Sequence, residues 1–362
     1  MLKKKQRQWT LERLETRELK AGDVTAIVQN GNLFLTEAAG QAGKDNSVIV
    51  SELSNGMVRV AGNATSDGTV SKVDGAASQD FRVTGSLNVN FGAGNDMVVL
   101  GGEGVPAMSP TFTAVSIDVS APQPVNASVA AATQTTGVAK AVVVTPPTTP
   151  IVSDNDNVVV WGVNVGGSMS INTGVGGDYV YVSGTNVGTS GSGNLSINTG
   201  IGGDVVDIEN VYGFIKGSMT VQMNGLSSDV DRVALNGAYA QGNIQIVTGA
   251  GNDFVNATDT TSFAKVNIAT GAGNDSVTLK NVHATDQVMA SLGDGNDSLN
   301  VDYLYSNDFD LDGGSGTNSL AITKNLYATG VGGKYTLSEI DWTYINGRYV
   351  PPYVGGTLGA HV

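Results

Sequence analysis

Aspartate residues close a glycine-rich turn repeatedly in the second half of the chain. The turns share the pattern G-x-G-x-D-x-V or G-x-G-x-D-x-L, and the hexapeptide TGAGND occurs at residues 248–253 and again at 270–275. Carboxylates that return at a fixed interval could stack in a column, and bent glycine turns would add backbone carbonyl oxygens. These are the oxygen ligands that calcium prefers. The pattern therefore indicates either cation sites between repeats or a structural use of the aspartates.

The structural alternative needs no metal. Glycine allows positive φ at a sharp corner, and an aspartate can accept backbone N–H groups of its own turn. Two carboxylates about 5 Å apart repel by about 3 kcal/mol at an effective dielectric of about 20. A stacked column must therefore be splayed into water, hydrogen-bonded, partly protonated or bridged by cations. The sequence leaves these open, and the candidate calcium ligands are Asp253, Asp275, Asp294, Asp297 and Asp312.

The aspartates mark a repeat. They stand at intervals of 22, 26, 27, 22, 22 and 22 residues, and Asn318 continues the series after 21; the aspartates are Asp156, Asp178, Asp204, Asp231, Asp253, Asp275 and Asp297. Short alternating runs precede the turns, as in GSMSINTG (167–174) and AKVNIATG (264–271). Side chains alternate between the two faces of a strand, so the apolar members of each run point one way.

One unit thus contains two strands and cannot bury its own apolar face. Stacked units can, if each strand pairs in parallel with its copy in the next unit. We therefore predict an all-β fold, a parallel β-helix or β-solenoid with coils of about 22 residues. Sequential hairpins are the competing topology, but they would not require a nearly constant interval.

The spacing and composition of the repeat vary along the chain and predict five segments. They are a leader with a short amphipathic helix (1–22), N-terminal solenoid coils (23–100), an insertion rich in Ala, Pro and Thr (101–153), the regular solenoid (154–325) and an aromatic C-terminal cap (326–362). The insertion is predicted to be mostly irregular. Its run FTAVSIDVS (112–120) could form one strand, either as part of a loop or as an edge strand offered to a partner.

Two short resemblances extend this interpretation. LERLETREL (11–19) resembles the Leu-Glu-x-Leu-Glu-x-Arg leader of secreted, repeat-rich planctomycete proteins, which implies export to the cell surface or the medium. The glycine turns resemble the repeats-in-toxin nonapeptide G-G-x-G-x-D-x-U-x, which implies calcium between neighbouring coils. The first glycine of that motif is replaced by Thr248, Thr270 and Leu292, and the motifs do not run in tandem.

Composition excludes several classes of function. The net charge of −14 and a pI of about 4.4 argue against nucleic-acid binding. Without cysteine there is no disulfide, thiolate nucleophile or cysteine-bound zinc. No apolar run is long enough for a membrane-spanning helix. His283 and His361 fit no catalytic spacing, and the acid–base cluster of Asp229, Asp231 and Arg232 is interpreted as a surface ion pair.

We therefore predict a non-enzymatic structural or adhesive protein at the cell surface or outside the cell, with calcium as the candidate stiffening ion and with cell-surface or extracellular glycans or proteins as partners. The alternative is a β-helix that binds or cleaves polysaccharide. An outward groove with at least two carboxylates and an aromatic shelf would favour the glycan alternative. A featureless polar shaft would favour the rod.

Overall fold

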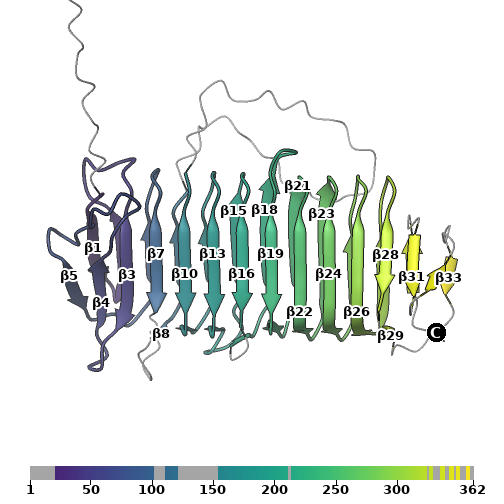
Figure 1. Cartoon of the computed structure of the whole chain (residues 1–362). Coiled ribbons are helices and arrows are strands. Elements are labelled where there is room, and N and C mark those ends of the chain that lie inside the picture. The colour runs from purple at the N-terminus through teal and green to yellow at the C-terminus, as the bar shows by residue number, and fades with distance from the viewer. Residues whose placement is uncertain are drawn as a thin grey trace, which may run out of the picture.

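Alternating side chains produce the strands that the sequence predicts. In β12 (Met169–Asn172) the side chains of Met169 and Ile171 are buried and Ser170 is exposed. The computed structural model describes residues 21–101, 111–120, 154–210 and 213–323, together with the backbone of five strands between 326 and 358. Within this part the chain is a parallel β-solenoid of about seven turns, with the strands of successive coils side by side in Figure 1.

One face of the solenoid is sheet A, with 13 strands in the order in which they follow each other along the axis. Its strands are β1 (Val24–Gln29), β2 (Asn32–Glu37), β6 (Leu87–Asn90), β9 (Val115–Asp118), β12, β15 (Leu195–Gly200), β18 (Met219–Gly225), β21 (Ile244–Ala250), β23 (Lys265–Ala272), β25 (Gln287–Ser291), β27 (Asp308–Asp312), β30 (Tyr335–Ser338) and β33 (Gly356–Leu358).

Sheet B contains the remaining 20 strands and covers the opposite side of the core. One series of its strands pairs from coil to coil along the axis: β3 (Ser47–Glu52), β7 (Met97–Gly101), β10 (Asn157–Trp161), β13 (Tyr179–Ser183), β16 (Val205–Glu209), β19 (Arg232–Asn236), β22 (Phe254–Ser262), β24 (Ser276–Ala284), β26 (Ser298–Ser306), β28 (Ser319–Ile322) and β31 (Trp342–Ile345). Short or terminal strands complete it: β4 (Val58–Gly62), β5 (Ser78–Phe81), β8 (Thr111–Phe112), β11 (Asn164–Val165), β14 (Asn186–Val187), β17 (Phe214–Ile215), β20 (Tyr239–Ala240), β29 (Leu326–Ala328) and β32 (Arg348–Val350).

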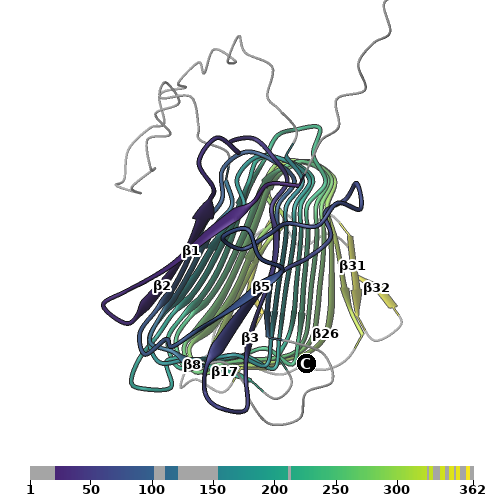
Figure 2. The ribbon, with the colours of Figure 1, turned by 90° about the vertical axis from the view of Figure 1, so that its left-hand side faces the viewer.

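The strands of successive coils pair in parallel, so equivalent residues lie over one another, as the view along the axis shows (Figure 2). One column of inward residues runs the length of sheet B: Val98, Val158, Val180, Val206, Val233, Val255, Val277, Leu299 and Leu320. This confirms the predicted parallel solenoid and the apolar position two residues after each aspartate.

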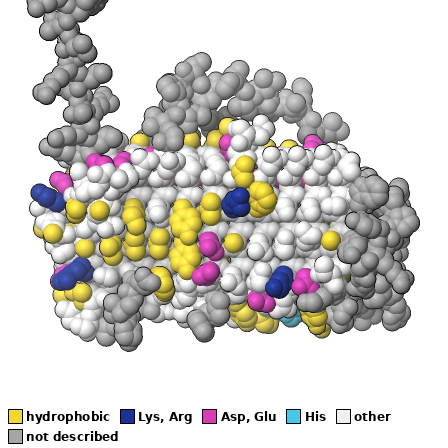
Figure 3. All heavy atoms as spheres, viewed as in Figure 1, with side chains coloured by type: hydrophobic (Ala, Val, Ile, Leu, Met, Phe, Trp, Pro, Cys, Tyr) yellow, Lys and Arg dark blue, Asp and Glu magenta, His cyan; other side chains and the backbone are white. Residues whose placement is uncertain are grey.

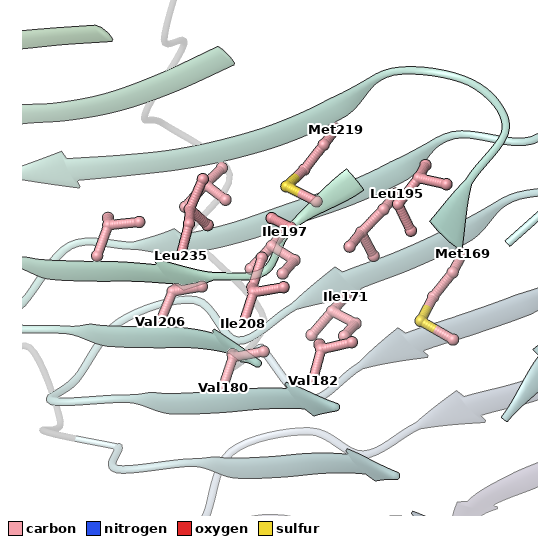
Figure 4. Close-up of a cluster of buried hydrophobic side chains, with 14 of the residues drawn as sticks. Met169, Ile171, Val180, Val182, Leu195, Ile197, Val206, Ile208, Met219 and Leu235 are labelled. Atoms are coloured by element: carbon pink, nitrogen blue, oxygen red, sulfur yellow. The ribbon is translucent and has the colours of Figure 1, made fainter. Parts of the chain in front are cut away.

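The core lies between the two sheets and is filled by side chains from both (Figure 4). Met169 and Ile171 of sheet A meet Val180 and Val182 of sheet B, and all four side chains are almost fully buried. Burying one such side chain stabilises a fold by about 1.5–3 kcal/mol. Each coil repeats this contribution, but only because the coils above and below cover its edges.

The Thr, Gly and Asn residues of TGAGND each have a position-specific role in the turn. Thr270 is buried, and its hydroxyl donates to the carbonyl oxygen of Leu292 in the next coil at 2.8 Å. Gly271 and Gly273 have φ of 101° and 138°, which favour glycine. The N–H of Asn274 donates to the side-chain oxygen of Asn252 in the preceding coil at 2.7 Å. The hexapeptide is thus explained by contacts between coils.

The first strands differ from the solenoid coils that the sequence predicted for residues 23–100. β1 pairs with β2, and β3, β4 and β5 pair with each other, in antiparallel order. Parallel pairing begins only where β2 meets β6 and β3 meets β7. An antiparallel layer at this end gives the first parallel strands a partner on their outer edge, and an unpaired edge would otherwise be a site of aggregation.

Part of the predicted insertion belongs to the solenoid. β9 lies between β6 and β12 in sheet A, and β8 pairs with β11, so residues 97–118 contribute strands to both sheets of one coil. The suggestion that FTAVSIDVS offers an edge strand to a partner is therefore wrong, because both edges of this strand are already paired. The remainder of the insertion, 102–110 and 121–153, lies outside the described residues.

Antiparallel pairs also lie at the C-terminal end of the described strands. At the C-terminal end β30 pairs with β33 and β31 pairs with β32 in antiparallel order, next to the last parallel strands. The predicted N-terminal helix and leader fall in residues that the structure does not describe. Within the described ranges no helix is long and apolar enough to cross a membrane.

We expect Gly273→Ala to destabilise the solenoid strongly. A methyl group there would lie 1.7 Å from the carbonyl oxygen of Gly251 in the neighbouring coil. Backbone strain and overpacking together would cost about 3 kcal/mol or more. Gly56→Ala is the matched control, since Gly56 also has positive φ (75°) but has no other atom within 4 Å of the added carbon; it should cost only about 1 kcal/mol. Thermal unfolding followed by circular dichroism measures both, and equal losses would contradict the close approach of the coils.

Candidate functional site

The repeated aspartates form one continuous column inside the corner between the two sheets. We call this column the aspartate ladder. From the second member onward, each side chain accepts, through Oδ1, the backbone N–H of the ladder residue before it at 2.7–3.0 Å. Its members, in order, are Asn46, Asp96, Asp156, Asp178, Asp204, Asp231, Asp253, Asp275, Asp297 and Asn318, and all are almost fully buried.

The ladder satisfies a backbone group that the sheet cannot reach at the corner. The carbonyl of Asp253 accepts the N–H of Ser276 in the next coil at 2.9 Å, as in an ordinary parallel pair. The N–H of Asp253 instead bonds to the Asp275 carboxylate at 2.8 Å. A buried N–H without a partner would cost about 1–3 kcal/mol. The acceptor thus belongs to the next coil, whereas the sequence analysis placed this contact within the aspartate's own turn.

The second carboxylate oxygen of the ladder aspartates has no hydrogen-bond partner. Oδ2 is buried and unpartnered at every aspartate of the ladder, from Asp96 to Asp297. Parallel strands are about 4.8 Å apart, and two charges at that distance repel by about 3 kcal/mol at an effective dielectric of about 20. A fully ionised ladder would therefore oppose the stacking that builds it.

Burial raises the pKa of several ladder carboxyls well above the usual range, among them those of Asp96, Asp156, Asp204, Asp231 and Asp275. It raises the pKa of Asp96 and Asp231 to about 8 and that of Asp156 to about 10, with neighbouring carboxylates adding to the rise. The pKa of Asp204 is raised to about 7 and that of Asp275 to about 6, again mainly by burial. Part of the ladder is therefore protonated, and uncharged, at neutral pH.

The ends of the ladder show how an uncharged side chain satisfies the same position. Asn318 keeps the Oδ1 contact to Asp297 at 2.9 Å, and its Nδ2 donates to the carbonyl oxygen of Gly314 at 3.0 Å. At the other end, Nδ2 of Asn46 donates to the carbonyl oxygen of Lys44 at 3.0 Å. A protonated carboxyl has the same shape and the same donor-plus-acceptor pattern as an amide.

Asn46 is the ladder residue that the sequence analysis did not identify. The signal was present, because Asn46 stands two residues before the buried Val48, as each ladder aspartate stands two residues before a Val or Leu. It was hidden because no glycine turn precedes it and because 50 residues separate it from Asp96.

The five candidate calcium ligands fall into two groups. Asp253, Asp275 and Asp297 lie in the ladder, with their side chains buried. Asp294 is exposed on its turn and accepts the hydroxyl of Ser315 at 2.7 Å, and Asp312 at the end of β27 accepts the N–H of Gly314 at 3.2 Å. In the described part of the chain no three Asp, Glu, His or Cys side chains are grouped so that they could hold a metal ion. Calcium binding therefore stays a prediction.

The cluster of Asp229, Asp231 and Arg232, predicted to be a surface ion pair, does not bring Asp231 and Arg232 together in the described structure. Consecutive residues of a strand point to opposite faces. Asp231 is buried in the ladder, whereas the Arg232 guanidinium lies outside, 4.6 Å from the ring centre of Phe254. The acid and the base that seemed closest in sequence are thus on opposite sides of the sheet.

Comparisons of the chain with protein-family models, with curated proteins and with solved structures gave no match. The site is therefore defined by its geometry. The aspartate ladder is a buried column that joins each coil to the next.

We expect the thermal stability to fall as the pH rises from about 5 to about 9. A carboxyl whose pKa is higher in the folded chain contributes stability that is complete below its unfolded pKa and is lost as the pH rises through the folded value. For the ladder these folded values run from about 6 at Asp275 to about 10 at Asp156. Asp67 and Asp80, whose pKa values are lowered by hydrogen bonds, act in the opposite sense only below about pH 4.

Asp275→Asn is the matched variant for this experiment. The amide stays neutral at every pH and keeps the acceptor for the N–H of Asp253. Its Tm should exceed that of the unchanged protein at about pH 9 by about 2–4 °C and match it only at about pH 4, near the unfolded pKa. Asp275→Ala removes the acceptor and should lower Tm at both pH values. An amide variant that is less stable by the same amount at both would show that the ladder carries no unfavourable charge.

Proposed function

We propose that the protein is a non-enzymatic structural component of the cell surface or the extracellular space, a shaft of fixed length and cross-section. The observation that carries this proposal is the unbroken ladder, which links the coils from Asn46 to Asn318 through buried side-chain hydrogen bonds. Because it runs beside the continuous core, bending the shaft would strain both at once. A stiff polar shaft suits a spacer or an adhesive support.

Export is the second part of the proposal. The LERLETREL segment supports it through its resemblance to the leader of secreted planctomycete proteins. The absence of cysteine from the sequence makes folding independent of the redox state outside the cell.

Calcium is the third part, and the buried Oδ2 atoms support it. The charge of the ladder can be met by protons or by a cation. A calcium ion takes about six to eight oxygen ligands, and the ladder leaves one carboxylate oxygen per coil without a partner. Two neighbouring ladder aspartates, such as Asp253 and Asp275 or Asp275 and Asp297, would supply two of these oxygens to each ion, and backbone carbonyls of the adjoining turns would have to supply the others.

Calcium and magnesium titrations separate these possibilities. At about pH 9, where protons no longer neutralise most of the ladder, calcium should raise Tm and an equal concentration of magnesium should not, because magnesium requires a smaller octahedral site. The Asp275→Asn variant should show a smaller calcium shift. If calcium and magnesium shift Tm equally, the ladder has no calcium-specific site and the calcium proposal fails. Protons would then remain the means of neutralising the ladder.

Export is tested in native cells with a C-terminally tagged chain. We expect the tag to be recovered in the envelope fraction or the medium and to be accessible to protease added to intact cells. A variant with Leu11, Leu14 and Leu19 changed to Ser should remain inside. Protection of the unchanged chain together with a cytosolic marker would contradict an extracellular role.

A further inference from the structure

The outward face of sheet B carries a concentration of aromatic side chains on strands β10 and β13, next to acidic side chains on β16. In Figure 3 this face shows a band of hydrophobic side chains with acidic ones beside it, while the C-terminal half of the same face is mostly polar and uncharged. We call the group the aromatic shelf, and its members are Trp161, Tyr179, Tyr181, Asp207 and Glu209.

Strand register fixes the spacing within the shelf. Tyr181 on β13 is paired with Asp207 on β16, so this ring and this carboxylate are neighbours. Trp161 lies in the row that passes through Ser183 to Glu209. Because adjacent strands are about 4.8 Å apart, the indole and the Glu209 carboxylate are about 10 Å apart along the axis.

The contacts hold the shelf in place and leave it accessible. The rings of Trp161 and Tyr181 meet edge to face with centroids 6.3 Å apart, and the Tyr181 hydroxyl donates to Glu209 Oε2 at 2.9 Å. Trp161 and Tyr179 are 39% and 36% exposed. Among the described residues the Asp207 carboxylate has no hydrogen-bond partner. The shelf therefore presents ring faces together with free acceptor oxygens.

The solenoid does not need these aromatic residues to fold. The row of Tyr179 passes through Val205, Arg232 and Phe254 and reaches Ser276, Ser298 and Ser319 only in later coils. The row of Trp161 continues with Asn236 and Thr258. Cross-strand aromatic pairs do stabilise sheets, but these later coils form without aromatic residues in these rows. Three large rings grouped on two neighbouring strands therefore indicate a binding surface.

We propose that the aromatic shelf binds a neutral polysaccharide laid along the solenoid axis. A sugar ring has an apolar C–H face that can stack on an aromatic ring and hydroxyl groups at its edge that can donate to carboxylates. A chain of such rings can cover Trp161 and still reach Asp207 and Glu209. Acidic polysaccharides would be repelled by the two carboxylates and by the net charge of −14.

A single cation fits the shelf less well. An ammonium or guanidinium group over Trp161 would gain the interaction with the ring face. It would lie about 10 Å from Glu209, close to the distance at which salt screens the attraction. The competing ligand is thus an extended basic peptide, which the experiment below tests. The proposal needs neither export nor calcium, so it stands or falls separately from the function proposed above.

Affinity electrophoresis of the full chain in gels that contain hydroxyethyl cellulose or galactomannan tests the proposal. At least one of these neutral polysaccharides should retard the protein. Trp161→Ala and Tyr179→Ala should each weaken binding at least about tenfold. Phe263→Ala is the matched control, since Phe263 is 51% exposed and stacks on Tyr239 at 5.3 Å, outside the shelf; it should bind as the unchanged chain does. Thermal unfolding of every variant separates lost binding from lost folding.

Asp207→Asn and salt distinguish the two extended ligands. The amide keeps an acceptor oxygen, so binding of a neutral polysaccharide should fall less than in Trp161→Ala and should hardly change with salt. Polylysine is the cationic probe. Binding of polylysine alone, abolished by Asp207→Asn or by salt, would overturn the proposal in favour of a basic peptide. Failure of both polysaccharides, or unchanged binding by a folded Trp161→Ala variant, would also overturn it.

Discussion

The structure depends on the burial of each coil's apolar face by the coils beside it. One coil offers a few Val, Leu, Ile and Met side chains from two strands, too few to form a core alone. Stacking makes the core continuous, and it requires that each coil have the same outline as its neighbours. The near-constant length of the repeat and the glycines at the turns both follow from this requirement. Gly271 and Gly293, for example, pass so close to the carbonyl of the preceding coil that no side chain fits.

Stacking identical residues has an electrostatic consequence. Any charged position inside the repeat becomes a column of like charges, and the ladder is such a column. The aspartate is nevertheless useful, because its Oδ1 reaches a backbone N–H that the sheet leaves without a carbonyl partner. Asparagine supplies the same acceptor without charge, as Asn318 does at the C-terminal end of the ladder. Aspartate within the ladder therefore adds a pH dependence that the fold itself does not require.

The repeat restricts the residues inside the shaft more than those on its outside. Inward positions are restricted by the next coil, so they vary little from Val180 to Leu320. Outward positions are free to change from coil to coil without altering the register. The aromatic shelf uses this freedom in two strands, whereas the row of Tyr179 carries Ser276, Ser298 and Ser319 in later coils. Sequence departures on the outer face, rather than the repeat itself, therefore indicate where a repeat protein meets its ligands.

The sequence determined the fold class, the parallel stacking, the inward Val and Leu positions and the membership of Asp253, Asp275 and Asp297 in one column. These follow from local periodicity, because a constant interval places equivalent residues over one another. Only the tertiary structure decided the rest. In the structure the first strands pair in antiparallel order and β9 lies inside the solenoid. Each ladder carboxylate accepts an N–H from the preceding coil, and Asp231 and Arg232 lie on opposite sides of the sheet. Trp161 and Tyr181 became one surface in the same way, 20 residues apart in sequence, because neighbours across a sheet are set by register rather than by distance along the chain.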